Sequence, residues 1–453
     1  MYLMSSLSTT PYKGTRDYYP DDKRIQNYIF DVWENTAKRF GYEEYGAPML
    51  EPVELYAAKS GQELVGEQTY HFVDRGNRQV AIRPEMTPTI SRMVAARRQE
   101  IAYPARLFSV ANFLRYERPQ RGREREFWQL NVDMFGDKGV GADAEIIQFG
   151  IELMRAFGAK DDMYVVKINN RILIDALMNE YLQLDAVQSQ LMIKLFDRKN
   201  KISNEEFRDQ AIEIFGAETA SVGLKKISDI LLMKDIHDIP KAIAENETVE
   251  EVKTLFEMLK KLGFENVVFD ITLMRGFDYY TGTVFEFFDL APENNRSMFG
   301  GGRYDGLVGL FGAEPVSAVG IAPGLSTTEL FLESHNLLPK LKTATELYVA
   351  TLGEDALYGA QAAAREMRNE SVNVELDTTL RKIDKQIKTA LKKGIPYIMF
   401  IGEKELKSEV YSLKDLASGN EQSLSVARIV SAVKDHRKKR QDTATHDELD
   451  ALL

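Results

Sequence analysis

The 453-residue chain contains no cysteine. Disulfide bonds and zinc sites built from thiolates are therefore excluded. The histidines are few and widely scattered, without metal-ligand spacing, so no metal site is expected; they are His71, His237, His335, His436 and His446. The missing cysteine fits a reducing compartment, and we expect a cytoplasmic protein.

Long apolar runs and a charged N-terminal start are also missing. No run approaches the roughly 18 apolar residues that a membrane-crossing helix needs, and MYLMSSLSTT lacks the pattern of a secretory signal. The net charge of −11 argues against indiscriminate binding of polyanions, although a local basic patch can still contact nucleic acid. We expect a globular protein of two or three domains without membrane association.

Residues 115–133, RYERPQRGREREFWQLNVD, carry an unusual concentration of arginine. A guanidinium group matches phosphate oxygens two at a time, so arginine without lysine suggests oriented anion recognition. Period-two alternation places Arg115 and Glu117 on one face of a first strand, and Gln129 and Asp133 on one face of a second. A salt-laced surface hairpin is the alternative. The mixture of Arg, Glu, Gln and Asp favours a site that recognises both phosphate and amine.

Two further segments carry polar groups suited to a small ligand. In LMRGFDYYTGTVFEF, residues 273–287, Arg275 lies close to Tyr279 and Tyr280, whose hydroxyls suit a flat polar ring. A packed aromatic cluster with a salt-bridged arginine explains this segment equally well. In RPEMTPT, Glu85 and Thr87 follow a strand and can hold an ammonium group, but helix capping explains this segment better when it is taken alone.

The segment FGGGRYDG, residues 299–306, is dense in glycine. Such a run lets the backbone approach a ligand closely or simply turns the chain. It has neither the GxGxxG spacing after a strand nor the Walker pattern, so neither a dinucleotide-binding fold nor a P-loop is supported.

Hydrophobic periodicity divides the chain into a sheet-based part, a helical module and a second α/β part. The module at 171–262 is almost wholly helical in pattern, and PKLKT at 339–343 reads as a linker. Strands and helices alternate beyond it, which predicts an independent domain with a parallel or mixed sheet. We expect its last helix at 424–435 and a frayed or disordered charged tail.

Together these segments closely resemble histidyl-tRNA synthetases, a family of class II aminoacyl-tRNA synthetases, over nearly the whole chain. KGTRDYYP resembles the family's opening, GYEEYGAPMLEP its motif 1 at a dimer interface, and RYERPQRGREREFWQ its motif 2. LMRGFDYYTGTVFEF and FGGGRYDGLV resemble its histidine-specific signatures, and residues 394–422 its anticodon-binding domain.

The resemblance implies an α/β (α+β) fold, with an antiparallel catalytic sheet flanked by helices, a helical insertion and a C-terminal α/β anticodon-binding domain, in a homodimer. The implied divisions are a catalytic domain at 1–170 and 263–335, the insertion at 171–262, the anticodon-binding domain at 343–433 and a charged tail at 434–453.

The implied function is that of a histidine–tRNA ligase. L-Histidine reacts with ATP, accompanied by Mg²⁺, to give histidyl-adenylate, and the histidyl group then passes to tRNA(His). A synthetase-like regulatory protein, such as the paralogue that partners ATP phosphoribosyltransferase, is the alternative. The presence of Arg115, Arg123, Arg275 and the C-terminal domain favours the enzyme.

By similarity, Arg115 and Arg275 are the catalytic residues, holding the α-phosphate and the substrate carboxylate. Glu117 meets the adenine amino group and Arg123 the outer phosphates of ATP. The remaining roles fall on two groups. Histidine is bound through its ammonium by Glu85, Thr87 and Gln129 and through its ring by Asp133 and Tyr280, with Tyr279 beside them; the acceptor end of tRNA is met by Arg118, Gln120 and Arg121.

The chain departs from the family pattern at two places. Asp133 stands where many members have glutamate. Motif 3 reads GIAPGLSTTELFL, so that Ser326 and Thr327 occupy the positions of a Glu-Arg pair whose arginine clamps the terminal phosphate. Ser326 and Glu329 instead form the pattern of a capping box. Loss of one charge-assisted contact costs roughly ten- to hundredfold in ATP affinity, unless another cation substitutes. A catalytically weak relative is the alternative.

Overall fold

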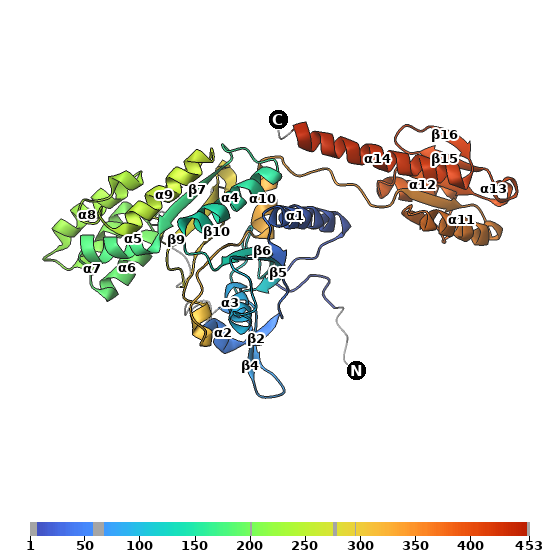
Figure 1. The fold of residues 1–453 in the computed structure, drawn as a ribbon. Helices are drawn as coiled ribbons and strands as arrows, with labels where there is room; N and C mark the ends of the chain where they lie inside the picture. The colour runs from blue at the N-terminus through green and yellow to red at the C-terminus, as the bar shows by residue number, and fades with distance from the viewer. Residues whose placement is uncertain (1–6, 58–67, 200–201, 275–278, 295, 451–453) are drawn as a thin grey trace. The chain divides into compact units, whose positions relative to one another are not determined.

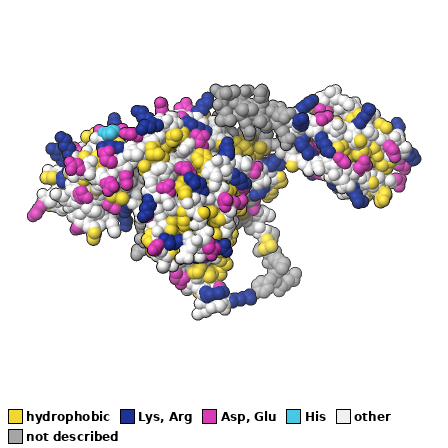
Figure 2. Space-filling model, in the orientation of Figure 1, with side chains coloured by type: hydrophobic (Ala, Val, Ile, Leu, Met, Phe, Trp, Pro, Cys, Tyr) yellow, Lys and Arg dark blue, Asp and Glu magenta, His cyan; other side chains and the backbone are white. Residues whose placement is uncertain are grey.

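The structure, a computed structural model, describes residues 7–57, 68–199, 202–274, 279–294 and 296–450. The chain forms two compact units, Met1–Leu338 and Pro339–Leu453. Within the described residues no helix is long and apolar enough to span a membrane. Lysine and arginine side chains are interspersed with aspartate and glutamate over the described part of the face in Figure 2.

The first unit is built on an eight-stranded sheet in the order β1-β5-β6-β11-β10-β9-β7-β8 (Figure 1). The central pairs are antiparallel, and only the edge pairs β1–β5 and β7–β8 are parallel. The strands are β1 Glu43–Glu44, β5 Ala105–Leu114, β6 Glu126–Phe135, β7 Tyr164–Asn170, β8 Val267–Phe269, β9 Thr283–Asp289, β10 Ser297–Arg303 and β11 Ala318–Ile321. The predicted sheet with flanking helices is therefore confirmed.

Helices α1 (Pro20–Arg39), α4 (Val140–Ala156) and α10 (Leu325–Ser334) share one apolar core with this sheet. Helix α1 illustrates why they form. Pro20 opens it, acidic residues occupy its first turn and basic residues its last, which suits the helix dipole. Its apolar stripe buries Ile29 and Trp33 completely against the sheet.

A smaller part of the first unit carries α2 (Val53–Ala57), α3 (Thr87–Ala96) and a three-stranded sheet. The strands, in the order β2-β4-β3, are β2 Leu50–Pro52, β3 His71–Val73 and β4 Gln79–Ile82. The segment that precedes α3 thereby comes to lie beside the large sheet, because Arg83 donates to the backbone oxygens of Asn112 and Ala47.

The helical module, whose helices are drawn mainly in green in Figure 1, has its own apolar core. Side-chain caps start several of its helices: Asp185 caps α6, Ser203 caps α7 and Asn246 caps α9. Its elements are α5 Arg171–Ala176, η2 Leu177–Tyr181, α6 Ala186–Asp197, α7 Asn204–Phe215, α8 Ala220–Leu232, η3 Ile236–Asp238 and α9 Glu247–Lys261. The predicted helical character is seen directly; its status as a separate insertion domain stays a prediction.

The second unit has a mixed five-stranded sheet, as predicted, in the order β13-β12-β14-β15-β16. The first three strands are parallel and the rest antiparallel. Its strands are β12 Leu347–Thr351, β13 Val374–Leu376, β14 Tyr397–Ile401, β15 Tyr411–Asp415 and β16 Glu421–Leu424. Its helices are η6 Glu354–Ala356, α11 Leu357–Asn369, α12 Ile383–Lys392, α13 Glu403–Ser408 and α14 Val426–Asp450.

Two predictions about local structure were wrong, and one alternative left open for a third segment is not supported. Helix α14 continues to Asp450 instead of ending at 435, because no glycine or proline stops it and Arg437 forms a bidentate ion pair with Glu346. Strand β5 ends at Leu114, so that Arg115 and Glu117 lie in the following loop. Most of the glycine-rich segment belongs to strand β10, between β9 and β11, so the turn alternative is not supported there. Close approach of this backbone to a ligand stays a prediction.

Candidate active site

A cavity of about 410 Å³ lies on the large sheet and is lined by residues of β6, β9, β10 and β11, by the loop after β5 and by the start of α10. We call it the sheet cavity. Its volume suits a small-molecule ligand. Nine residues predicted from the sequence line it: Glu85, Thr87, Arg115, Glu117, Arg123, Gln129, Asp133, Tyr279 and Tyr280.

Three other predicted residues, Arg118, Gln120 and Arg121, are not among the described residues that line the sheet cavity. Arg118 and Gln120 line a second, more open depression, which shares Glu117 and Arg123 with the sheet cavity. Arg121 is not among the residues that line either depression. Arg275 lies outside the described residues.

Asp133 lies at the buried end of the sheet cavity. It pairs in register with Gly320 of β11, where a Cβ atom would overlap the Asp133 carboxylate. The Tyr304 hydroxyl donates a hydrogen bond to Asp133 Oδ1. Burial raises the pKa of Asp133 to about 7, and the bond from Tyr304 opposes that shift. This carboxyl therefore changes charge near neutral pH.

A second carboxylate, Glu85, faces the paired tyrosines. Its side chain is only 3% exposed and accepts a hydrogen bond of 2.8 Å from the Tyr279 hydroxyl. The rings of Tyr279 and Tyr280 meet edge to face, with centroids 5.1 Å apart. The capping alternative for Glu85 and Thr87 is not supported, because the N-cap of α3 is Met86 and no side chain caps it.

Gln129 of β6 lies between these carboxylates and the start of α10. Its Nε2 donates to the Ala322 backbone oxygen at 3.1 Å. This bond fixes the amide plane and leaves the amide oxygen as the group able to accept from a ligand.

Arg115, Glu117 and Arg123 lie at the other end of the sheet cavity. Arg115 Nε donates to the Pro84 backbone oxygen at 2.9 Å, and its guanidinium lies over the Phe127 ring. Arg123 approaches Glu117 to 3.3 Å, with the arginine side chain 61% exposed and the glutamate 13%. The loop thus presents two cations next to the largely buried carboxylate of Glu117. Arg115 is held by the backbone, whereas the Arg123 side chain is largely exposed.

The predicted capping box at α10 is wrong. The helix begins at Leu325 with Gly324 as its N-cap, so Ser326 already lies inside the helix. The Ser326 hydroxyl donates to Glu124 Oε2 at 3.0 Å, and Thr327 donates to the Gly324 backbone oxygen at 3.1 Å. Both hydroxyls are therefore engaged by the protein itself.

The N-terminal segment is bound to this end of the sheet cavity. Arg16 forms a bidentate pair with Glu329 of α10, at 2.7 and 3.0 Å. The Arg125 backbone N–H donates to the Gly14 oxygen, and its guanidinium donates to the Tyr12 hydroxyl at 3.0 Å. Residues 12–16 thereby hold both the arginine-rich loop and α10.

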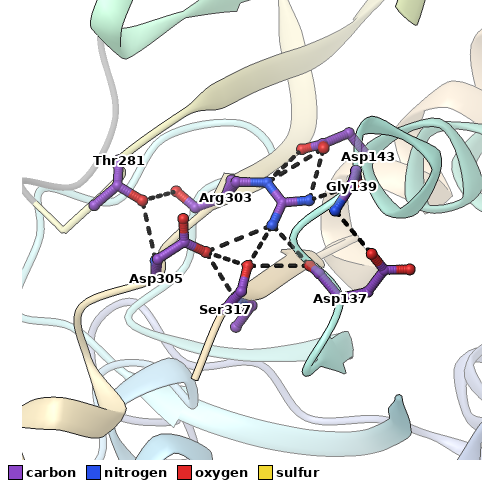
Figure 3. A network of polar contacts seen from close by, with 8 residues as sticks. Asp137, Gly139, Asp143, Thr281, Arg303, Asp305 and Ser317 are labelled. Carbon is purple, nitrogen blue, oxygen red and sulfur yellow. Dashed lines mark hydrogen bonds and ion pairs between the residues drawn. The ribbon is translucent and has the colours of Figure 1, made fainter. Parts of the chain in front are cut away.

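Arg303, the last residue of β10, organises a buried polar network (Figure 3). Its guanidinium donates to both oxygens of Asp143 and to the backbone oxygens of Asp137 and Gly139. It also donates to the Ser317 hydroxyl. Because Tyr304 follows directly, this network fixes the position from which Tyr304 reaches Asp133.

The sequence patterns missed Tyr304 as a site residue and gave no role to Arg303, Glu124 or Arg16. Arg303 and Tyr304 lie within the glycine-rich segment and Glu124 within the arginine-rich one, but neither pattern gave these residues a role. The Tyr304 hydroxyl meets a carboxylate 171 positions away along the chain.

Comparison with known proteins agrees with this geometry. The family model described as histidyl-tRNA synthetase matches residues 14–327, and one described as anticodon binding domain matches residues 346–436. A histidine–tRNA ligase of Leptospira biflexa is 41% identical, covering 96% of this chain and 99% of that protein. A histidine–tRNA ligase of Thermococcus kodakarensis is 34% identical, covering 93% and 97%.

Solved structures show the same fold. The histidyl-tRNA synthetase of Nostoc sp. PCC 7120 has a TM-score of 0.77 and 22% identity, covering 95% of this chain and 100% of that one. A Bacillus halodurans C protein titled as an ATP phosphoribosyltransferase regulatory subunit/histidyl-tRNA synthetase has a TM-score of 0.71 and 23% identity, covering 87% and 99%. Likeness at this level of identity shows the fold alone.

The sheet, the cavity and the matched domains define a class II aminoacyl-tRNA synthetase. More narrowly, the chain belongs to the histidyl-tRNA synthetase family. The predicted family, fold and ligase function are thereby confirmed, and the regulatory alternative is not favoured, since relatives 34–41% identical are histidine–tRNA ligases.

Proposed function

We propose that the chain activates L-histidine with ATP and transfers the histidyl group to tRNA(His). One observation carries the proposal: nine side chains predicted from three separate sequence segments line a single cavity. The cavity offers carboxylates for an ammonium and an imidazole at one end and guanidinium groups for phosphates at the other. This order matches the two substrates of amino-acid activation.

In the first step, a histidine carboxylate oxygen attacks the α-phosphorus of ATP and pyrophosphate leaves. Arg115, held by the Pro84 backbone oxygen, stabilises charge on the α-phosphate. We assign Arg275 the matching role on the substrate carboxylate. Glu117 meets the adenine amino group and Arg123 the outer phosphates. Catalysis then comes from positioning and charge stabilisation, without a covalent enzyme intermediate.

Recognition of histidine divides between two ends of the amino acid. Glu85, Thr87 and Gln129 bind the ammonium group. Asp133 and Tyr280 bind opposite nitrogens of the imidazole, with Tyr279 packed beside them. A site built to hydrogen-bond a polar side chain rejects analogues without it by a factor on the order of ten thousand or more.

In the second step, the 3′-terminal adenosine of tRNA attacks the activated carbonyl and AMP leaves. Arg118, Gln120 and Arg121 of the loop would meet the acceptor end, and the second unit would bind the anticodon. Mg²⁺ would enter with ATP as part of the substrate; the cavity carboxylates Glu117 and Glu124 are engaged by Arg123 and Ser326. A cytoplasmic homodimer completes the proposal.

Histidine-dependent exchange of labelled pyrophosphate into ATP tests the first step directly. We expect exchange with histidine and none with phenylalanine or glutamine, because these leave Asp133 or Tyr280 without a partner. Absence of exchange at millimolar ATP and histidine would refute the proposal. Charging of tRNA(His) transcripts tests the second step independently.

A further inference from the structure

Arg296 lies between η4 (Pro292–Asn294) and the start of β10, outside every role assigned so far. Its guanidinium packs over Gly122 at the tip of the arginine-rich loop, where a Cβ atom would overlap Arg296 Nη2 and Leu330 Cδ1 of α10. Gly122 itself lines the sheet cavity and has a φ of +68°, which favours glycine. Arg296 therefore lies where the loop and α10 meet.

A chain of buried polar groups orients this guanidinium. Arg296 Nε donates to Asn294 Oδ1 at 3.1 Å, and Asn294 Nδ2 donates to Asp289 Oδ2 at 2.6 Å. Asp289 is fully buried and also contacts His335 Nε2 at 2.8 Å. The arginine is held by its Nε, which leaves its two terminal nitrogens directed away from Asn294.

The Nη2 end of the Arg296 guanidinium has no carboxylate bound to it among the described residues. Its Nη2 is buried and has no hydrogen-bond acceptor among the described residues. Burial lowers the pKa of Arg296, and the positive charges of Arg121 and Arg123 lower it further. A partly buried cation beside two other cations, with one nitrogen fully buried, is costly unless an anion neutralises it. Three guanidinium groups of this kind suit a polyphosphate.

We propose that Arg296 binds the terminal phosphates of ATP together with Arg123, and so supplies the cation that Ser326 and Thr327 do not. The inference rests on the proposed function, because it assigns a further residue to the same nucleotide. Thr327 lines the sheet cavity, and Leu330, which borders the same Gly122 position as Arg296, lies three positions later on the same face of α10. The arginine thus lies near this face of α10, at the position just before strand β10.

The first test compares Arg296→Met and Arg296→Lys with wild type in pyrophosphate exchange. Methionine keeps the apolar stem, and lysine keeps the charge without the fork. We expect the methionine variant to raise the KM for ATP roughly ten- to hundredfold, with an unchanged KM for histidine, and the lysine variant to lie between. Arg198→Met, which removes an exposed arginine 3.5 Å from Glu206 in the helical module, is the matched control and should leave both values unchanged.

The second test places Thr327→Arg in both backgrounds. If Arg296 fills the clamp, the new arginine restores ATP affinity in the Arg296→Met protein and changes the wild type little. An equal gain in both backgrounds, or an unchanged KM for ATP in Arg296→Met, would overturn the inference.

Calorimetric titration with ATP and with inorganic pyrophosphate separates this inference from the proposed function. Both should bind the wild type more tightly than Arg296→Met, whether or not exchange occurs. Binding that depends on Arg296 without any exchange would reject the proposed function and retain the phosphate site. Exchange with normal ATP binding in the variant would do the reverse.

Discussion

Strand β10 has an arginine at each end, and their surroundings differ sharply. All three guanidinium nitrogens of Arg303 donate to protein acceptors, among them the buried Asp143. Arg296, just before the strand, has one bond from Nε and a buried Nη2 without an acceptor among the described residues. A buried cation with every donor satisfied supports the scaffold, whereas one with donors left over is suited to a ligand.

Two buried carboxylates, Asp143 and Asp133, differ in the same way. Asp143 receives a bidentate arginine, which opposes the rise in its pKa caused by burial. Asp133 receives one tyrosine hydroxyl, and its pKa rises to about 7. The first is paired with a guanidinium inside the structure, and the second keeps acceptor capacity for a substrate.

The largest expected effect is on stability and concerns Arg303, the residue at the end of β10 whose donors are all satisfied. Arg303→Met leaves Asp143 buried without its cation and should lower the free energy of unfolding by about 3–5 kcal/mol, measured by urea denaturation. Arg296→Met is the matched control, and its change should stay within about 1 kcal/mol. The double variant Arg303→Met, Asp143→Leu should recover much of the loss. Similar losses for the two single variants would break the comparison.

The next effect concerns substrate binding at Asp133. Asp133→Asn keeps the volume and removes the charge, so we expect the KM for histidine to rise roughly ten- to hundredfold. The KM for ATP should not change, because the nucleotide groups lie at the other end of the cavity. Steady-state exchange kinetics measure both constants. A larger effect on ATP than on histidine would contradict the assigned ends.

The smallest effect is a pH dependence. Asp133 is neutral below its pKa of about 7 and ionised above it, so kcat/KM for histidine should rise between pH 6 and 8. The substrate imidazole, with a pKa of about 6.5, titrates in every variant; the part of the rise that Asp133→Asn lacks is therefore due to Asp133. Tyr304→Phe removes a bond that lowers this pKa and should move the rise to higher pH.

The same titration affects stability with a definite sign. The folded pKa lies above the unfolded value, so the contribution of Asp133 is fully present below about pH 4 and is lost as the pH rises through about 7. Wild type should therefore lose stability relative to Asp133→Asn over this window, as thermal melts at several pH values would show. A constant difference between the two proteins would contradict the pKa.

Alternation along one strand and resemblance to a family were enough to predict most of the named residues that line the sheet cavity. Gln129 and Asp133 lie on β6 and line the cavity as the period of two predicts. The capping box failed because the local pattern could not reveal that Glu124 and Arg16 would bind Ser326 and Glu329.

Long-range partners set the limit of sequence reasoning here. Arg303 meets Asp143 across 160 positions. No periodicity links such residues; only the order in which the strands assemble brings them together. The glycine-rich segment was likewise ambiguous, because close approach of the backbone to a ligand and a turn both call for glycine.

The attachment of residues 12–16 to the arginine-rich loop and to α10 bears on how the protein can be altered. None of these residues lines the sheet cavity, yet Arg16 binds Glu329 of α10 and the Gly14 backbone binds the arginine-rich loop. An affinity tag spliced close to Tyr12, or a trimmed amino terminus, would loosen the nucleotide end while leaving the histidine end intact. Any fusion partner should therefore be joined well before residues 12–16.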